Sequence, residues 1–206
     1  VVAYQVYAKY KAGNHLGQNF DSIAVDGSPP LGADGYGVSS TTAIFGNAPS
    51  GVIVLSGANS YTGATTVASG TLRAGSAAAF GVNSAVSLSN TPGTTLDANG
   101  FNNTIGSLTG GGTVALGTAT LTVGTDNTSP AAFTGTITGD SGSMVKKGTG
   151  TLTLGLGAAS NFSQLVVSSG IVSTTVTNLG LASTIVLGDV ATGGSEVQFT
   201  TTGASI

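Results

Sequence analysis

One strand–turn–strand pattern occurs twice in this chain and limits the folds that it can adopt. The stretch GVIVLSGANSYTGATTVASGTLRAG covers residues 51–75, and GTLTLGLGAASNFSQLVVSSGIV covers residues 150–172. Each begins with an alternating strand, passes a turn of small residues and an aromatic residue, and reaches a second strand. Further short strands bounded by glycine lie between the two copies, and whole units recur at roughly 20 to 25 residues, a period typical of a β-solenoid.

The alternation within these strands predicts which side chains are buried. In GTLTLGLG the residues Leu152, Leu154 and Leu156 fall on one face of the strand, whereas Thr151 and Thr153 fall on the other. One strand cannot bury its leucines alone, but coils stacked about 4.8 Å apart would form a continuous interior column. We therefore predict an all-β chain that coils into a β-solenoid with short Gly-rich turns. The residues predicted to point inward are Leu55, Leu72, Val114, Leu116, Leu121, Val123, Leu152 and Leu154.

The composition agrees with stacked coils and excludes several classes of protein. Charged residues make up 6% of the chain and glycine supplies 34 residues, while hydrophobic residues reach 40%, too many for a disordered chain. Like charges would repeat at strand spacing up a stacked face, which is unfavourable. The net charge of -3 argues against nucleic-acid binding. No apolar run is long enough for a membrane-spanning helix, and the absence of cysteine excludes disulfides and thiolate metal sites.

The texture of the sequence changes near Ser50. Residues 1–50 hold four of the five tyrosines and the only histidine. From there to the last residue, the sequence keeps the pattern of short alternating strands bounded by glycine. We therefore predict an N-terminal capping or assembly segment at residues 1–50 and a β-solenoid repeat domain at residues 51–206.

The first residues, VVAYQVYAKYK, form an alternating aromatic strand with two plausible roles. The strand could cap the open end of the solenoid, or it could pair with the next subunit by strand addition. Residues 196–206 contain one acid, no lysine and no proline, so they block an open edge weakly. Head-to-tail stacking, with copies of the chain or with adjacent repeats of a longer chain, is the expectation. The predicted assembly residues are Val2, Tyr4, Val6, Tyr7 and Tyr10.

Lys146 and Lys147 are two of the five basic residues and precede the Thr-Leu strand. We expect both to lie in a solvent-exposed turn, where they add solubility. The alternative is that two adjacent lysines bind a ligand.

Residues 106–155 closely resemble the autotransporter-associated β-strand repeat of bacterial surface proteins. The family pattern reads approximately L-T-K-x-G-x-G-T-L-T-L-S-G-x-N-x-Y-x-G-x-T-x-V-x-x-G-T-L, and the resemblance covers about residues 51–172. It implies a right-handed parallel β-helix of the kind found in passenger domains, adhesins and large proteins of the extracellular surface. The first half is matched by Lys146, Gly148, Gly150, Thr151, Leu152, Thr153 and Leu154. The second half is matched by Leu55, Ser56, Gly57, Asn59, Tyr61, Gly63, Thr65, Val67, Gly70, Thr71 and Leu72.

The residues that could perform catalysis do not form a recognisable set. His15, the only histidine, lies in a polar turn near Asp21, and we expect a surface role for it. Asp97 and Asp126 are the pair of acids that neighbouring coils could bring together, but aspartates that bond their own turns are the stronger expectation. The loops around these two acids are too poor in carboxylates for calcium, and we predict no cofactor. The acids are Asp21, Asp26, Asp34, Asp97, Asp126, Asp140, Asp189 and Glu196.

These observations favour a non-enzymatic structural module of a bacterial extracellular surface protein, either an adhesin stalk or a fibre subunit that stacks end to end. An alternative is a solenoid that recognises a glycan, on a host or another surface, or ice through rows of threonine. A third alternative, a polysaccharide-degrading enzyme, requires paired carboxylates in a cleft.

Overall fold

The computed structural model describes residues 42–45, 51–59, 61, 63–175, 182–188 and 195–199. The predicted assembly residues Val2, Tyr4, Val6, Tyr7 and Tyr10 lie outside the described residues, as does His15. The boundary predicted at Ser50 stays a prediction, although a short strand at Thr42–Phe45 already pairs with the solenoid.

Sixteen strands and no helix make up the described part of the chain, and none of it could therefore cross a membrane as a helix. The strands are β1 (Thr42–Phe45), β2 (Val52–Leu55), β3 (Ala64–Val67), β4 (Thr71–Ala74), β5 (Val86–Leu88), β6 (Thr95–Asp97), β7 (Asn103–Ile105), β8 (Leu108–Gly110), β9 (Thr113–Ala115), β10 (Thr120–Val123), β11 (Thr136–Lys146), β12 (Thr151–Leu154), β13 (Asn161–Val167), β14 (Gly170–Thr174), β15 (Ala182–Leu187) and β16 (Ser195–Phe199).

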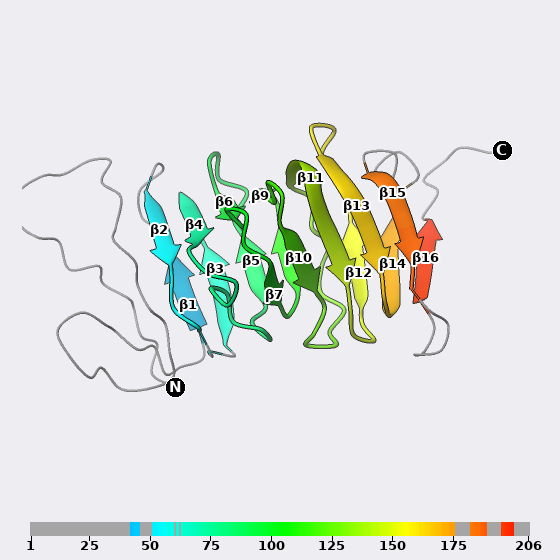
Figure 1. Cartoon of the computed structure of the whole chain (residues 1–206), viewed down its shortest axis with the longest axis horizontal. Helices are drawn as coiled ribbons and strands as arrows, with labels where there is room; N and C mark the ends of the chain where they lie inside the picture. Colours follow the sequence, from blue (N-terminus) through cyan, green and yellow to red (C-terminus); the bar gives the residue numbers. More distant parts are fainter. Residues whose placement is uncertain are drawn as a thin grey trace, which may run out of the picture.

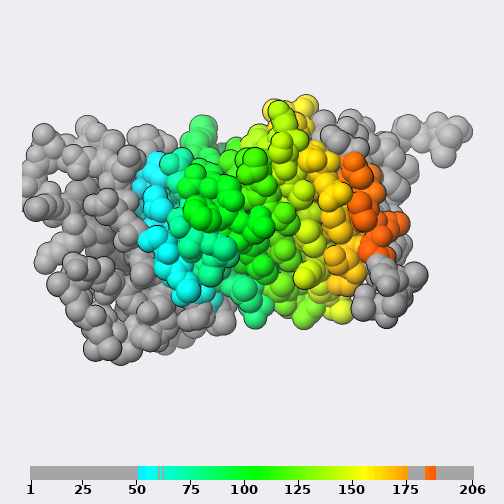
Figure 2. Space-filling model, viewed as in Figure 1, coloured from blue at the N-terminus to red at the C-terminus, as the bar shows by residue number. Residues whose placement is uncertain are grey.

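The strands stack in parallel into a β-solenoid. The nine-stranded sheet, sheet A, runs β2-β4-β6-β9-β11-β13-β15, with β7 and β10 joined beside it. The opposite wall, sheet B, consists of β1-β3-β5-β8 and β12-β14-β16, linked by bridges from Phe133 to Gly110 and Leu154. Figure 1 shows successive strands following one another along the long axis, and Figure 2 shows the same order on the surface. The predicted fold is confirmed.

The pairing register confirms the repeat length that the sequence suggests. Thr65 pairs with Val86, and Val86 pairs with Leu108, so these partners lie 21 and 22 positions apart along the chain. In sheet A the step is less regular, because Thr95 lies 24 positions after its partner Thr71 and 18 before its partner Thr113. Each coil is therefore close to one predicted unit, and the turns between strands absorb the variation in length.

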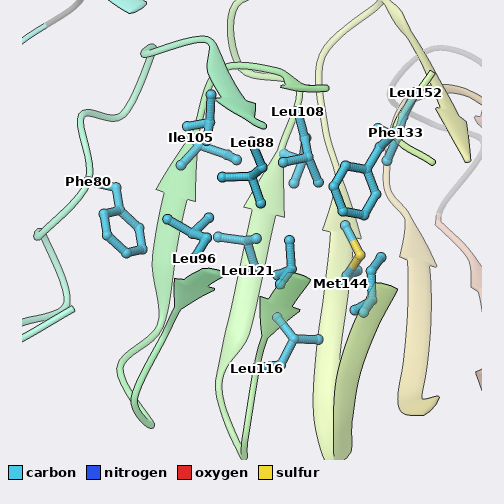
Figure 3. Close-up of a cluster of buried hydrophobic side chains, with 14 of the residues drawn as sticks. Phe80, Leu88, Leu96, Ile105, Leu108, Leu116, Leu121, Phe133, Met144 and Leu152 are labelled. Atoms are coloured by element: carbon cyan, nitrogen blue, oxygen red, sulfur yellow. The ribbon is translucent and has the colours of Figure 1, made fainter. Parts of the chain in front are cut away.

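The core consists of aliphatic columns that run from coil to coil. Leu72, Leu96, Val114 and Ile137 are consecutive partners in sheet A, and all four are at most 1% exposed. Figure 3 shows how such side chains from successive strands meet inside the solenoid. All eight residues predicted to point inward are buried, so the assignment of faces is confirmed.

The two copies of the repeat occupy opposite walls of the solenoid. In the first copy, β2 and β4 lie in sheet A and β3 lies in sheet B. In the second copy, β12 and β14 lie in sheet B and β13 lies in sheet A. The copies are therefore half a coil out of phase, and the same strand sequence serves either wall because both walls need the same alternation of faces.

Candidate functional site

Lys146 lies inside the solenoid, and this corrects the expectation that both lysines are exposed. It is the last residue of β11 and pairs in register with Val123 of β10 and Val167 of β13. Only 1% of Lys146 is exposed, whereas Lys147 faces solvent. The expectation is wrong for Lys146 because the strand continues through it, and alternation from the buried Met144 places it on the inward face.

The ammonium group of Lys146 is surrounded by main-chain carbonyls. Its Nζ donates hydrogen bonds to the carbonyl oxygen of Lys147, to that of Gly148 at 2.9 Å and to that of Ser169 at 3.4 Å. Burial lowers the pKa of Lys146, and the carboxylate of Asp126 acts in the opposite direction. A lysine that meets three acceptors in this way is held as part of the wall and is not presented to a ligand.

Glycine makes the space for this buried lysine. A Cβ at Gly124 would lie 3.0 Å from the Lys146 Nζ, and a Cβ at Gly170 would lie 2.8 Å from it. Both glycines also have positive φ, 107° and 73°, which L-residues with side chains rarely adopt. The atoms nearest to such a Cβ are the carbonyl oxygens of Lys147 at Gly124 and of Gly148 at Gly170, so the close approach of the backbone is the main requirement for glycine and the lysine adds a second one.

The loop at Asp126 and Asn127 ties one coil to the next. The Oδ1 of Asp126 accepts hydrogen bonds from the backbone N of Thr128 at 3.2 Å and from its hydroxyl at 3.0 Å. The Oδ1 of Asn127 accepts a hydrogen bond from the backbone N of Thr149 at 3.0 Å, in the following coil. Asn127 has a φ of 60°, in the left-handed region that asparagine tolerates. This loop is an Asx turn of the kind that the sequence predicts, now seen to bridge two coils.

The structure gives Asp97 partners of its own. The Nε of Arg73 lies 2.7 Å from the Oδ2 of Asp97, and the backbone N of Asn99 lies 2.8 Å from its Oδ1. Asp97 thus bonds its own turn, as predicted, and also pairs with the neighbouring coil. Asp140 accepts a hydrogen bond from the side-chain amide of Asn161. Within the described residues, no group of three or more His, Asp and Glu could hold a metal ion.

The motif N-x-Y-x-G-x-T of the first copy forms a buried polar ladder between coils. The side-chain amide of Asn59 donates to the carbonyl of Ala79 at 2.6 Å. The hydroxyl of Thr65 donates to the Tyr61 hydroxyl at 3.2 Å and lies 2.7 Å from that of Ser84. Burial raises the pKa of Tyr61. The residues shared with the family pattern therefore connect one coil to the next. Their spacing in the sequence identifies the motif, but it does not predict their hydrogen-bond partners in the neighbouring coil.

One outward column of sheet A holds four consecutive threonines after Val52, which is the partner of Thr71 in β2. Thr71 pairs with Thr95, Thr95 with Thr113 and Thr113 with Thr136, and all four are half-buried. The next outward column along the same strands is mixed and does not extend this threonine surface. Its members are Val54, Arg73, Asp97, Ala115, Thr138 and Asn161.

Two interior columns continue to strand β15, where they are open to solvent. Leu165 pairs with Ile185 and Val167 pairs with Leu187. Leu165 and Val167 are fully buried, but Ile185 is 39% exposed and Leu187 is 57% exposed. The solenoid therefore presents apolar core positions at this end.

Comparison with known proteins agrees with this architecture. The model of the passenger-associated-transport-repeat matches residues 50–74 and 144–177. The protein described as "Adhesin BmaC autotransporter", of Brucella suis biovar 1 (strain 1330), is 48% identical to this chain over 124 residues. That alignment covers 58% of this chain but only 4% of the relative. No solved structure matches the chain. The matched repeats and this identity support the resemblance of these parts of the chain to autotransporter passenger repeats.

Proposed function

We propose that this chain is a section of a non-enzymatic stalk whose coils continue end to end into further coils of the same repeat. As an adhesin-like module of an autotransporter passenger, it belongs to the bacterial surface or the extracellular space. The observation that carries the proposal is the open end of the interior columns at β15, where Ile185 and Leu187 stand in line with buried Leu165 and Val167. The relative is far longer than this chain, and repeats on either side would close such an end.

The edge of β15 suits a further parallel strand of the same kind. Its sequence, ASTIVL, contains no charged residue and no proline, the two features that commonly block an edge strand. A coil added there would extend the pairing by about 4.8 Å and cover Ile185 and Leu187. The aromatic strand that contains Val2, Tyr4, Val6, Tyr7 and Tyr10 is the predicted complement when the added coil comes from another copy.

The absence of catalysis belongs to the same proposal. The side chains of the three described aspartates are engaged by neighbouring groups. Asp97 forms an ion pair with Arg73 and accepts a hydrogen bond from the backbone of Asn99. Asp126 accepts a hydrogen bond from Thr128, and Asp140 accepts one from Asn161. A glycosidase instead holds two carboxyl groups about 5 to 10 Å apart across a bound sugar. We expect purified chain to release no product from polysaccharides.

End-to-end association is tested with charges placed on the edge. The full chain should associate as its concentration rises, and the double change Ile185→Lys and Leu187→Lys should keep it monomeric, because charged edges resist pairing. The matched control is Thr184→Lys, on the exposed outward face of the same strand, which should still associate. Removing residues 1–11 should weaken association without unfolding the solenoid. Light scattering measures the molecular mass of all four proteins as a function of concentration. A full chain that stays monomeric at high concentration would contradict end-to-end stacking.

A second candidate function, recognition of a glycan, is favoured by the threonine column of sheet A. Its hydroxyls repeat at the strand spacing of about 4.8 Å and offer both donors and acceptors to an extended polymer. Thr95→Val with Thr113→Val should abolish binding on a glycan array, whereas Thr151→Val and Thr153→Val on sheet B should not. Equal binding by both variants would remove this candidate.

A further inference from the structure

Lys146 interrupts an otherwise aliphatic interior column. Along this column Ile105 pairs with Val123, Val123 with Lys146, and Lys146 with Val167. Leu187 follows as the partner of Val167. Every other member can be exchanged for its neighbour with a small change of volume, whereas the lysine brings a charge that needs acceptors.

The acceptors of Lys146 come from two successive coils. Lys147 and Gly148 supply carbonyls from the corner that follows β11, and Ser169 supplies one from the corner that follows β13. Gly124 and Gly170 leave the space that the side chain fills, one from the coil before and one from the coil after. The carbonyls of Lys147 and Gly148 stay beside Lys146 in any register, so the bond that depends on the position of β11 is the one to Ser169 in the following coil.

The alternation of faces does not fix that position. A slip of two residues between β11 and β13 keeps every inward side chain inward, because the side-chain period of a strand is two. Such a slip would pair Lys146 with Leu165 in place of Val167 and displace its Nζ by about 6.6 Å relative to the Ser169 corner. In a chain of short, similar strands, this error leaves the apolar pattern intact.

We propose that Lys146 sets the register between β11 and β13, because its buried ammonium joins the carbonyls of its own corner to the carbonyl of Ser169 in the following coil. This role is independent of the stalk function proposed above.

The chain contains no cysteine, so engineered pairs report the register directly. Val145→Cys with Val166→Cys joins native partners on the outward face, at a distance that a disulfide spans. Val145→Cys with Gln164→Cys reports a slip of two residues, since native diagonal neighbours lie about 7 to 8 Å apart. Val145→Cys with Ser168→Cys reports the opposite slip. With Lys146 present, only the native pair should close under mild oxidation.

Lys146→Met should let at least one slipped pair close severalfold faster, with the β-sheet circular dichroism retained. The matched control, Lys147→Met, removes the adjacent exposed lysine and should leave native-only closure. Lys146→Gln is scored in the same way, in case the methionine variant does not fold. Native-only closure in either folded variant would overturn the proposal, and so would loss of folding in both, because the lysine would then be needed for the fold in any register.

Discussion

A side chain on the inward face of this solenoid contacts its own coil and the coils on both sides, so its environment depends on three strands. Leu152 is 3% exposed and pairs with the fully buried Val172 in the next coil. Lys146 shows the same rule for a polar residue: its position on the strand decides its burial, and the neighbouring carbonyls make that burial tolerable. Alternation from Met144 already indicates an inward Lys146, but the carbonyls that accept its hydrogen bonds belong to the folded corners and have no signal in the sequence.

Leu152→Ala should lower the free energy of unfolding by about 2 to 5 kcal/mol, because it leaves a cavity in a packed core. Thr151→Ala, one residue away on the half-buried outward face, should change it by less than about 0.5 kcal/mol. Urea titrations followed by circular dichroism give both values. Equal losses would contradict the assigned faces.

The lowered pKa of Lys146 predicts how this group affects stability with pH. The folded chain releases this proton at a lower pH than the unfolded chain, whose lysines titrate near their ordinary value of about 10.4. Between the two pKa values the unfolded state binds more protons, so the contribution of Lys146 to folding stability rises with pH in that window and is constant below it. NMR titration of the Lys146 Nζ checks the direction, and a midpoint at or above about 10.4 would contradict burial as the dominant effect.

At the scale of elements, the strands themselves were predictable and their pairing was not. Alternation and glycine turns locate β12 or β3, but three-residue strands such as β7 and β9 carry too little pattern to show which wall they join. The first part of β11 pairs with β9 and its last part pairs with β10. Between the two parts, the register of its pairing with β13 shifts between Gly139 and Ser143. Three residues of β11 there face the single residue Ser163 of β13, a bulge that re-aims the strand.

Within the bulge of β11, adjacent positions should differ in their sensitivity to an added methyl group. A Cβ at Gly142 would overlap the Cβ of the buried Leu116, while Ser141 beside it is exposed. Gly142→Ala should therefore lower the free energy of unfolding by about 1 to 3 kcal/mol through overpacking, and Ser141→Ala should leave it nearly unchanged. Thermal denaturation of the two variants distinguishes them, and an unchanged Gly142→Ala would show that Leu116 has room to move.

At the scale of the whole molecule, the solenoid is a stack in which each coil contacts mainly its neighbours, with a hydrogen bond from the Thr125 hydroxyl to the Val82 carbonyl reaching one coil further. Stability in such an array is approximately a sum of coil and interface contributions, so complete coils can be removed in principle. The pairing of Thr113 with Thr136 defines one full coil as residues 113–135. The repeat period in the sequence predicts an array of similar coils, and the pairing register in the structure defines where one coil begins and ends.

Removing residues 113–135 should leave a folded rod that is shorter by about 4.8 Å. β6 would then pair with β11, since both are partners of β9, and Leu96 would meet Ile137 in the interior column. Lys146 should keep its acceptors, because the carbonyls of Lys147, Gly148 and Ser169 all remain. Gly106, which lies one coil before Gly124 and accepts its backbone hydrogen bond, would take the place of Gly124 beside the lysine.

The matched control removes residues 113–124, about half a coil, which deletes β9 and β10 but keeps the loop back to sheet B. That chain should lose cooperative unfolding, because sheet A is left without a strand in one coil while sheet B is intact. Small-angle scattering measures the length of both deletion variants, and thermal denaturation measures the cooperativity of their unfolding. If the full-coil deletion unfolds as readily as the half-coil deletion, the stability of this solenoid is not a sum of exchangeable coils. The contacts that set the register, such as those of Lys146, would then influence coils beyond their nearest neighbours.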